Sequence, residues 1–208
     1  MSNRTATVDR ATRETSVRVV LDLDGEQRID VATGIGCLDH LLLTLAFHAG
    51  WDLALSCEGD RHVDDHHTAE DCGIALGRAV REAQGARPVT RFGAAHALLD
   101  AALARAVVDL SGRPWPEVSL GLERETLGGL AAENVGHVVR SFAVELRAAV
   151  HVDVLKGAND HHRAEAAFKA LALALHAALE PVSGGVPSTK GVVGEPCDSK
   201  RKRAGRRQ

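Results

Sequence analysis

The segment Asp65-His66-His67-Thr68-Ala69-Glu70 recurs 95 positions later as Asp160-His161-His162-Arg163-Ala164-Glu165. Each copy follows an alternating apolar segment and a turn, and each opens a stretch with apolar residues at helical spacing. The repeat therefore predicts two copies of one structural unit, in which a strand leads to a helix that begins with paired histidines.

The residues before the first copy predict a hairpin, a helix and a strand. Apolar alternation over 17–23 meets the turn dipeptide Asp24-Gly25 and resumes at 29–31, which predicts a β-hairpin. Leucines at helical spacing over 38–45 predict a helix, and renewed alternation over 53–57 predicts a strand.

The second copy is preceded by the same order of elements. Residues 107–112 resemble 20–25, the apolar pattern over 138–146 predicts a helix, and 151–155 predicts a strand. The final helix should run from Asp160 to Glu180.

This order of elements predicts the fold class and its division. We expect an α+β fold, an internally duplicated two-layer α/β sandwich in which helices cover one face of each sheet. The two halves are expected at 1–93 and 94–193, and 194–208 is expected to be a disordered basic tail.

The repeated histidines and glutamates have the spacing of metal ligands. Residues four apart share one face of a helix, so His66 with Glu70, and His161 with Glu165, can each chelate a metal ion. The adjacent His67 and His162 point about 100° away around the helix, so they should reach something else, such as a second metal.

Two further histidines, His40 and His137, occupy matching helices of the two halves. Pseudo-twofold symmetry then predicts two four-residue sites, the first made by His40, His66, Glu70 and His162, and the second by His137, His161, Glu165 and His67. Imidazole and carboxylate ligands without thiolate favour Mn, Fe, Co or Zn.

For the other aspartates and histidines near the repeat, the sequence either leaves two roles open or favours a role outside the metal sites. Asp65 and Asp160 either orient a neighbouring imidazole or cap their helices. His62 has no assigned role. For His96, His151 and His176, a packing or solvent-facing role is expected.

Composition limits the classes of protein and of partner. A chain of 208 residues with 45% apolar residues can bury a core, and its 3% aromatic content argues against a stacking platform for bases. The net charge of −3 includes six basic residues over 200–207, so the body is acidic and no nucleic-acid partner is expected.

The expected compartment follows from cysteine spacing and hydropathy. The four cysteines lack Cys-x-x-Cys spacing, which favours reduced thiols and a cytoplasmic location. The sequence predicts no signal peptide and no membrane span.

Several motifs, taken in order, resemble those of the imidazoleglycerol-phosphate dehydratase family over Arg10 to Gly191. The carrying segments are Arg13-Glu14-Thr15, Thr33-Gly34-Ile35-Gly36-Cys37-Leu38-Asp39-His40, Asp64-Asp65-His66-His67-Thr68-Ala69-Glu70-Asp71, Arg91-Phe92-Gly93, Asp109-Leu110-Ser111-Gly112-Arg113-Pro114, Gly157-Ala158-Asn159-Asp160-His161-His162 and Pro187-Ser188-Thr189-Lys190-Gly191. The sequence departs from the family's usual residues at Leu41, Phe47 and Ala49, and in the tail from Glu195.

The resemblance implies a fold, cofactors and an assembly. It implies a duplicated ββαβα-type half of the ribosomal protein S5 domain 2-like kind, two Mn²⁺ ions per active site, and a large homo-oligomer of 24 subunits built from trimers. The completed sites are then expected at subunit contacts.

The resemblance also implies site residues. The metal ligands would be His40, His66, His67, Glu70, His137, His161, His162 and Glu165. Glu14 and His48 would be catalytic. Substrate contacts would come from Glu14, His40, His48, Arg91, Arg113, Lys169, Ser188, Thr189 and Lys190.

The implied reaction dehydrates D-erythro-imidazole glycerol phosphate to imidazole acetol phosphate in histidine biosynthesis. The proton lost is not next to a carbonyl, so activation must come through the ring. Two metals on the two ring nitrogens would favour an imidazolate, whose electrons expel the adjacent hydroxyl. A carboxylate such as Glu14 suits the acid/base role, and the arginines and lysines suit a phosphate monoester.

Two other functions remain open at this point. A dinuclear metallohydrolase acting on another phosphorylated metabolite would use the same ligands. A catalytically silent, metal-dependent assembly protein would use the histidines only to join subunits. For the basic tail, a solvated terminus is expected rather than a nucleic-acid site.

Overall fold

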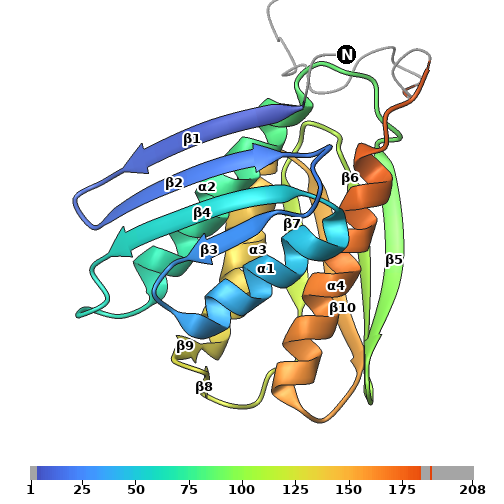
Figure 1. Ribbon diagram of the computed structural model, residues 1–208. Helices are drawn as coiled ribbons and strands as arrows, with labels where there is room; N and C mark the ends of the chain where they lie inside the picture. The colour runs from blue at the N-terminus through green and yellow to red at the C-terminus, as the bar shows by residue number, and fades with distance from the viewer. Residues whose placement is uncertain (1–3, 184–187, 189–208) are drawn as a thin grey trace, which may run out of the picture.

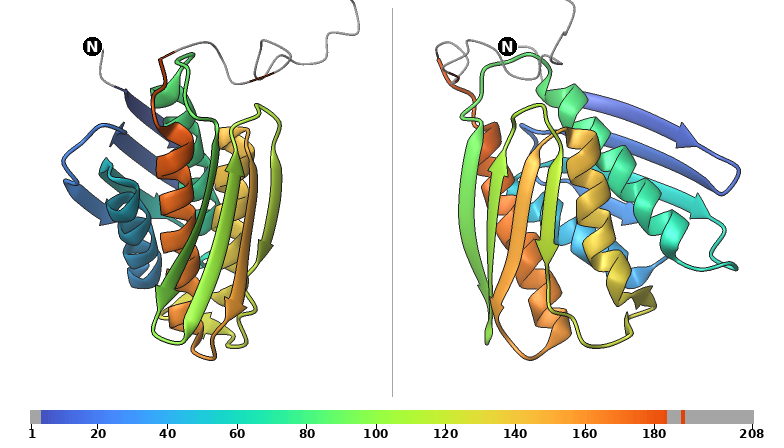
Figure 2. Two further views of the ribbon diagram at one scale, coloured as in Figure 1. Left: turned by 90° about the vertical axis from the view of Figure 1, so that its right-hand side faces the viewer. Right: turned by 180° about the vertical axis from the view of Figure 1, so that it is seen from behind.

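The computed structural model describes residues 4–183 and residue 188, and this part of the chain forms two four-stranded sheets with four helices between them (Figures 1 and 2). Each sheet has one face against the helices and one face outward. The predicted α+β sandwich with a helix layer on each sheet is therefore confirmed, and the two halves join helix to helix.

The first half is built around one mixed sheet in the order β1-β2-β4-β3. Its elements are β1 (Thr5–Ala11), β2 (Thr15–Asp22), β3 (Ile29–Ala32), α1 (Gly36–Ala49), β4 (Asp52–Gly59) and α2 (His66–Gln84). β4 pairs antiparallel with β2 and parallel with β3.

The second half repeats this topology in the order β5-β6-β10-β7. Its elements are β5 (Phe92–Leu99), β6 (Ala102–Asp109), β7 (Trp115–Ser119), β8 (Thr126–Leu127), β9 (Leu130–Ala131), α3 (Ala132–Leu146), β10 (Ala149–Lys156) and α4 (Asp160–Leu179). β10 pairs antiparallel with β6 and parallel with β7, as β4 does with its neighbours, so the sheets support the duplication. The expected division after residue 93 falls two residues into β5.

Alternation of side chains explains why each sheet has a single buried face. In β2, Val17, Val19 and Leu21 are buried against the helices, while the residues between them face outward. Val108 in β6 and Val150 in β10 are fully buried in the same way in the second half. This pattern anchors each helix pair to its own sheet.

The helix layer holds the halves together through two close pairs, α2 with α3 and α1 with α4. Gly73 of α2 faces the backbone of α3, where an added Cβ would lie 2.6 Å from the carbonyl oxygen of Val138. Gly77, one turn later, faces the Phe142 carbonyl in the same way. The absence of side chains at these two positions lets α2 approach α3 closely.

The predicted hairpin over 17–31 is wrong. β2 and β3 do not pair with each other, because β4 lies between them. The hairpin of this sheet is β1 with β2, and β1 had not been predicted. After Asp24-Gly25 the chain is held instead by Asp52 of β4, whose side chain accepts hydrogen bonds from the N–H groups of Glu26 (2.6 Å) and Arg28 (2.9 Å).

Three further predictions from the sequence were reduced cysteines, no membrane-spanning helix and a disordered C-terminal tail. Cys37, Cys57 and Cys72 are free thiols. Among the described helices, none is both long and apolar enough to cross a membrane. Cys197 and the tail over 194–208 lie outside the described residues.

Candidate active site

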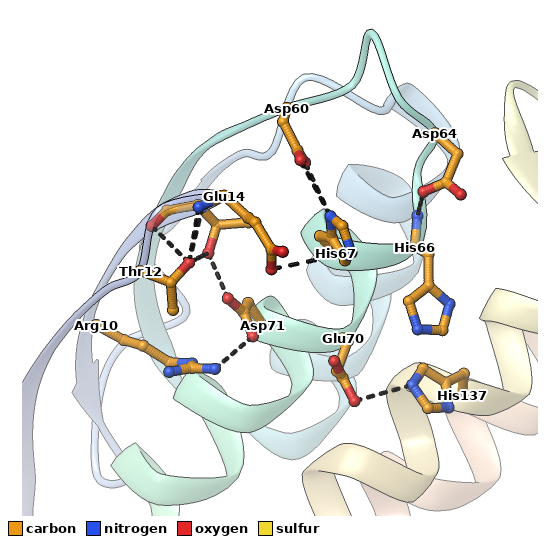
Figure 3. Close-up of polar contacts among 11 residues, drawn as sticks. Arg10, Thr12, Glu14, Asp60, Asp64, His66, His67, Glu70, Asp71 and His137 are labelled. Atoms are coloured by element: carbon orange, nitrogen blue, oxygen red, sulfur yellow. Dashed lines mark hydrogen bonds and ion pairs between the residues drawn. The ribbon is translucent and has the colours of Figure 1, made fainter.

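The α2–α3 cluster consists of His66 and Glu70 on α2 and His137 on α3 (Figure 3). Glu70 Oε1 lies 3.2 Å from His137 Nε2, and the rings of His66 and His137 stack with centroids 4.7 Å apart. All three side chains are half-buried. The i, i+4 pair predicted from the repeat is thus completed by a histidine from the other half of the chain.

The α1–α4 cluster is the counterpart of the α2–α3 cluster and consists of His40 on α1 with His161 and Glu165 on α4. Glu165 Oε2 lies 3.0 Å from His40 Nε2 and 3.2 Å from His161 Nε2. The rings of His40 and His161 stack at 5.4 Å, nearly parallel at 10°. One duplication has therefore produced two clusters of the same composition.

Both clusters fit a divalent metal ion. Their ligand atoms lie within 4.8 Å of one another. Two donors bound at about 2.1 Å and at right angles on one ion lie roughly 3 Å apart, which matches the spacings around Glu70 and Glu165. Imidazole with carboxylate suits Mn, Fe, Co or Zn, and each cluster offers three ligands, which leaves coordination positions for further groups.

The predicted grouping of these ligands is wrong in one respect. His40 was expected beside His66 and Glu70, and His137 beside His161 and Glu165, but the structure exchanges the two. The reason is the helix layer, since α1 packs on α4 and α2 packs on α3. Each helical pair of ligands therefore meets a histidine from the opposite half.

His67 and His162 lie outside both clusters. His67 points toward the β1–β2 turn, where its Nδ1 lies 3.1 Å from Asp60 and its Nε2 lies 3.9 Å from Glu14 (Figure 3). The hydrogen bond with Asp60 raises the pKa of His67 above its ordinary value. His162 Nδ1 similarly lies 3.6 Å from Asp100, so both rings have a carboxylate at Nδ1.

Asp65 is the N-cap residue of α2 by position, but in the described residues neither its side chain nor that of Asp160 makes a capping hydrogen bond or a hydrogen bond to an imidazole. The Asp65 side chain accepts from the N–H of Ala131 at 2.6 Å, and Asp160 accepts from the N–H groups of Glu123 and Arg124. Each aspartate therefore ties the start of its helix to the segment before α3.

The helix starts are capped by the preceding residues. Asp64 accepts from the N–H of His66 at 2.8 Å, and Asn159 accepts from the N–H groups of His161 and His162. These caps fix the first turn of α2 and of α4, where the paired histidines lie.

Glu14 lies in the turn between β1 and β2, and a buried network holds that turn against α2. Thr12 Oγ1 accepts from the N–H of Glu14 at 3.1 Å, and Thr15 Oγ1 donates to buried Asp71. Asp71 also binds Arg10 at 2.7 Å (Figure 3). Because Asp71 follows Glu70 directly, one segment of α2 positions both the candidate ligand Glu70 and the exposed Glu14.

Lys169 and His48 lie near the α1–α4 cluster. Lys169 Nζ lies 2.7 Å from Glu165 Oε1. Burial raises the pKa of Glu165, but hydrogen bonds from Lys169 and His40 outweigh it and lower this pKa from 4.5 to about 2. Burial and the charge of Lys169 lower the pKa of half-buried His48, so His48 is biased toward the neutral form.

Arg91 and Arg113, the expected phosphate contacts, lie at the opposite end of α4 from His161. The N–H of Arg91 donates to the carbonyl of Ala178 at 2.8 Å, and Ala178 is 17 residues along α4 from His161. At 1.5 Å per residue this separation is about 25 Å. Arg113 lies at the same end, because the N–H of Leu110 donates to the carbonyl of Arg91 and the hydroxyl of the next residue, Ser111, donates to the carbonyl of Arg113. Neither arginine can therefore reach a substrate held at the α1–α4 cluster of the same chain.

The two arginines differ in their surroundings. The guanidinium of Arg91 pairs with Asp109 at 2.7 Å and stacks over Phe92, whereas Arg113 is exposed. Ser188 is half-buried and has a polar partner. Thr189 and Lys190 lie outside the described residues.

Comparison with known proteins identifies the family. Residues 33–175, more than half of the chain, match the family model described as imidazoleglycerol-phosphate dehydratase. The chain belongs to the imidazoleglycerol-phosphate dehydratase family. Its members are hydro-lyases of histidine biosynthesis, so the resemblance seen in the sequence is confirmed and the chain is an enzyme.

Individual imidazoleglycerol-phosphate dehydratases are similar over nearly the whole chain. A relative from Candida glabrata is 52% identical over 90% of this chain and 99% of its own length, and one from Saccharomyces cerevisiae is 49% identical over 93% and 100%. The dehydratase structure from Pyrococcus furiosus superposes with a TM-score of 0.80 at 37% identity, covering 89% of this chain and 100% of its own. That from Staphylococcus aureus has a TM-score of 0.75 at 33% identity, covering 86% and 99%.

The departures from the family's usual residues are accommodated locally. Phe47 is 48% exposed and meets the ring of His48 edge-on at 5.3 Å. The carbonyl of Ala49 accepts from His176 Nδ1 at 3.0 Å, which gives His176 the packing role expected for it. His62, His96 and His151 are exposed and lie outside both clusters.

Proposed function

We propose that this chain dehydrates D-erythro-imidazole glycerol phosphate to imidazole acetol phosphate, with one divalent metal ion in each kind of cluster at every active site. The observation that carries the proposal is the pair of His-His-Glu clusters, which have the same composition and come from the two duplicated halves of a family member. Two equivalent ions suit a substrate whose imidazole ring has two nitrogens.

Metal ions held by the two His-His-Glu clusters would supply Lewis acidity, which would stabilise negative charge on the imidazole ring. The protein side chains do the rest of the chemistry. Glu14, exposed in a turn that is anchored through Thr15 and Asp71, is suited to take the proton next to the leaving hydroxyl. Neutral His48 is available on the α1 side.

The active site is proposed to be shared between subunits. Each cluster holds three ligands, and His67 and His162 are turned away from both with a carboxylate at Nδ1. A carboxylate hydrogen-bonded to Nδ1, as Asp60 is to His67, orients an imidazole so that Nε2 can bind a metal. We assign these two histidines as ligands to clusters of neighbouring subunits, and the separation of about 25 Å along α4 between His161 and Ala178, which Arg91 contacts, supports the same sharing.

Shared sites require an oligomer, and we propose 24 subunits built from trimers, working in the cytoplasm with Mn²⁺. The proposed substrate contacts are Glu14, His40, His48, Arg91, Arg113, Lys169, Ser188, Thr189 and Lys190. Zn²⁺, Co²⁺ and Fe²⁺ remain alternatives for the metal, because each accepts the same donors.

The test is product analysis on metal-stripped protein reconstituted in turn with Mn²⁺, Zn²⁺, Co²⁺ and Fe²⁺. We expect no turnover without metal, and imidazole acetol phosphate without free phosphate after reconstitution. Free phosphate would identify a metallohydrolase. Metal-dependent assembly without any turnover would identify an assembly protein.

A further inference from the structure

One polar side chain beside the α2–α3 cluster has no counterpart in the α1–α4 cluster. Asn134, in the first turn of α3, is only 2% exposed, and its Oδ1 lies 3.1 Å from His66 Nδ1. A carboxamide oxygen accepts hydrogen bonds and cannot donate them, so His66 Nδ1 carries the proton in this contact. In the neutral ring Nε2 then keeps its lone pair, and this tautomer presents Nε2 to a metal ion.

The position of Asn134 couples two ligands of the same cluster. Asn134 precedes His137 by three residues, so the two side chains share one face of α3. α3 thereby supplies one ligand directly and holds a ligand of α2 through the amide. Burying an amide side chain costs free energy unless the amide is hydrogen-bonded, so the contact with His66 also holds Asn134 in place.

The α1–α4 cluster is built differently at both corresponding points. The residue three before His40 is Cys37, and within residues 4–183 and 188 the His161 ring has no amide or carboxylate at Nδ1. Its glutamate, Glu165, is bound by the ammonium of Lys169, which competes with a metal ion for the carboxylate. The residue in the place of Lys169 on α2 is Ile74, which cannot compete in this way.

We infer that Asn134 is a positioning residue that holds His66 in its metal-binding tautomer and makes the α2–α3 cluster the tighter of the two metal sites. This inference rests on the proposed function, because it requires both clusters to bind metal. Asn134 acts through His66 and has no contact with the metal or the substrate.

The test measures Mn²⁺ affinity in backgrounds that keep a single cluster. His161→Ala leaves the α2–α3 cluster intact, and His66→Ala leaves the α1–α4 cluster intact. Free Mn²⁺ is followed by electron paramagnetic resonance during titration of the full-length metal-free protein. In the His161→Ala background, Asn134→Leu, which keeps the size but loses the acceptor, should weaken binding about 10- to 100-fold.

Two matched variants separate positioning from a general structural role. Asn134→Asp keeps an oxygen acceptor and should restore most of the affinity, whereas Cys37→Ala, at the corresponding position before His40, should change neither site. In the His66→Ala background, Asn134→Leu should have no effect. Before mutation, nitrogen NMR of the metal-free protein should find His66 protonated at Nδ1, which tests the contact even if Asn134→Leu fails to fold.

The outcomes distinguish the inference from the function beneath it. If the wild-type protein binds two Mn²⁺ per chain and Asn134→Leu changes affinity by less than about twofold in the His161→Ala background, the inference alone is overturned. Equal weakening in both backgrounds, or His66 protonated at Nε2, overturns it as well. If the wild-type protein binds no metal, the inference and the proposed function both fail.

Discussion

His40 Nε2 lies 3.0 Å from Glu165 Oε2, although the two residues are 125 positions apart and belong to different halves of the duplication. The contact exists because α1 packs on α4. Each half therefore depends on the other for a complete three-ligand cluster, and this dependence can be tested with pairs of substitutions.

The first prediction concerns which ligands act together. His40→Ala should remove about one metal per chain, and adding His40→Ala to Glu165→Gln should cause no further loss, because both residues serve one cluster. Adding it to Glu70→Gln should remove the second metal as well. Elemental analysis after gel filtration measures the metal content per chain of each variant, with exposed His96→Ala as the control. The reverse pattern would restore the grouping expected from the sequence alone.

A second prediction concerns Glu14. Glu14→Gln should keep its metals and lose turnover by roughly 10²- to 10⁴-fold, because an amide keeps the shape of the side chain but cannot accept the proton. Glu58→Gln, an exposed carboxylate on neighbouring β4, is the matched control and should retain activity. Loss of metal in Glu14→Gln would make Glu14 a ligand rather than a base.

A third prediction follows from the low pKa of Glu165 in metal-free protein. Because its folded-state pKa of about 2 lies below the ordinary 4.5, ionised Glu165 stabilises the fold above pH 4.5, and this contribution is lost as the pH falls toward 2. Glu165→Gln should therefore cost about 2 kcal/mol of unfolding free energy at pH 7, the scale of a charge-assisted hydrogen bond, and progressively less in acid.

Urea unfolding with a chelator, at pH values between 7 and 3, measures this difference. Glu117→Gln on the exposed face of β7 provides the control. A cost that does not change with pH would show that the Lys169 and His40 contacts do not set the ionisation of Glu165.

A fourth prediction links metal to assembly. Chelation should reduce the particle to small oligomers, and Mn²⁺ should restore the large one, because a shared site makes metal affinity part of subunit affinity. Acid should act like a chelator, since imidazole binds metal only when neutral and its ordinary pKa is about 6.5. Light scattering measures the particle mass after chelation and after acidification. His67→Ala should fail to reassemble with Mn²⁺, whereas the control His96→Ala should reassemble.

The local part of the site was predictable because it depends on helical spacing. Residues four apart must share a face, so the pairs His66 with Glu70 and His161 with Glu165 follow from the sequence. The histidine that completes each cluster from a neighbouring helix could not be predicted, because no local sequence pattern indicates that α1 packs on α4. The order of helix, strand and helix in each half was likewise predictable from periodicity, whereas strand pairing depends on which strand lies between two others.

Other errors have equally specific causes. β1 was missed because Val8 is its only fully buried residue, so it carries no alternating pattern. Asp24-Gly25 is typical of a hairpin turn, and the sequence does not show that Asp52 holds the chain after it. Asp60, Asp71 and Asn134 hold candidate ligands or the turn of Glu14 through contacts with residues distant in sequence, and no spacing rule marks such residues.

The central claim is that a dehydratase site forms only when two subunits contribute to it. Its most direct test mixes two variants that each damage a different contributor, His161→Ala at the α1–α4 cluster and Arg113→Ala at the far end of α4. Each variant alone should be nearly inactive. The two are mixed without metal, reassembled with Mn²⁺ and assayed for imidazole acetol phosphate, and mass spectrometry verifies that the particles are mixed.

An equal mixture should recover about a quarter of the wild-type turnover, because a site that draws its two contributors at random from symmetric copies has both intact in one case of four. Verified mixed particles that are no more active than the separate variants would contradict the account, since every site would then be complete within one chain.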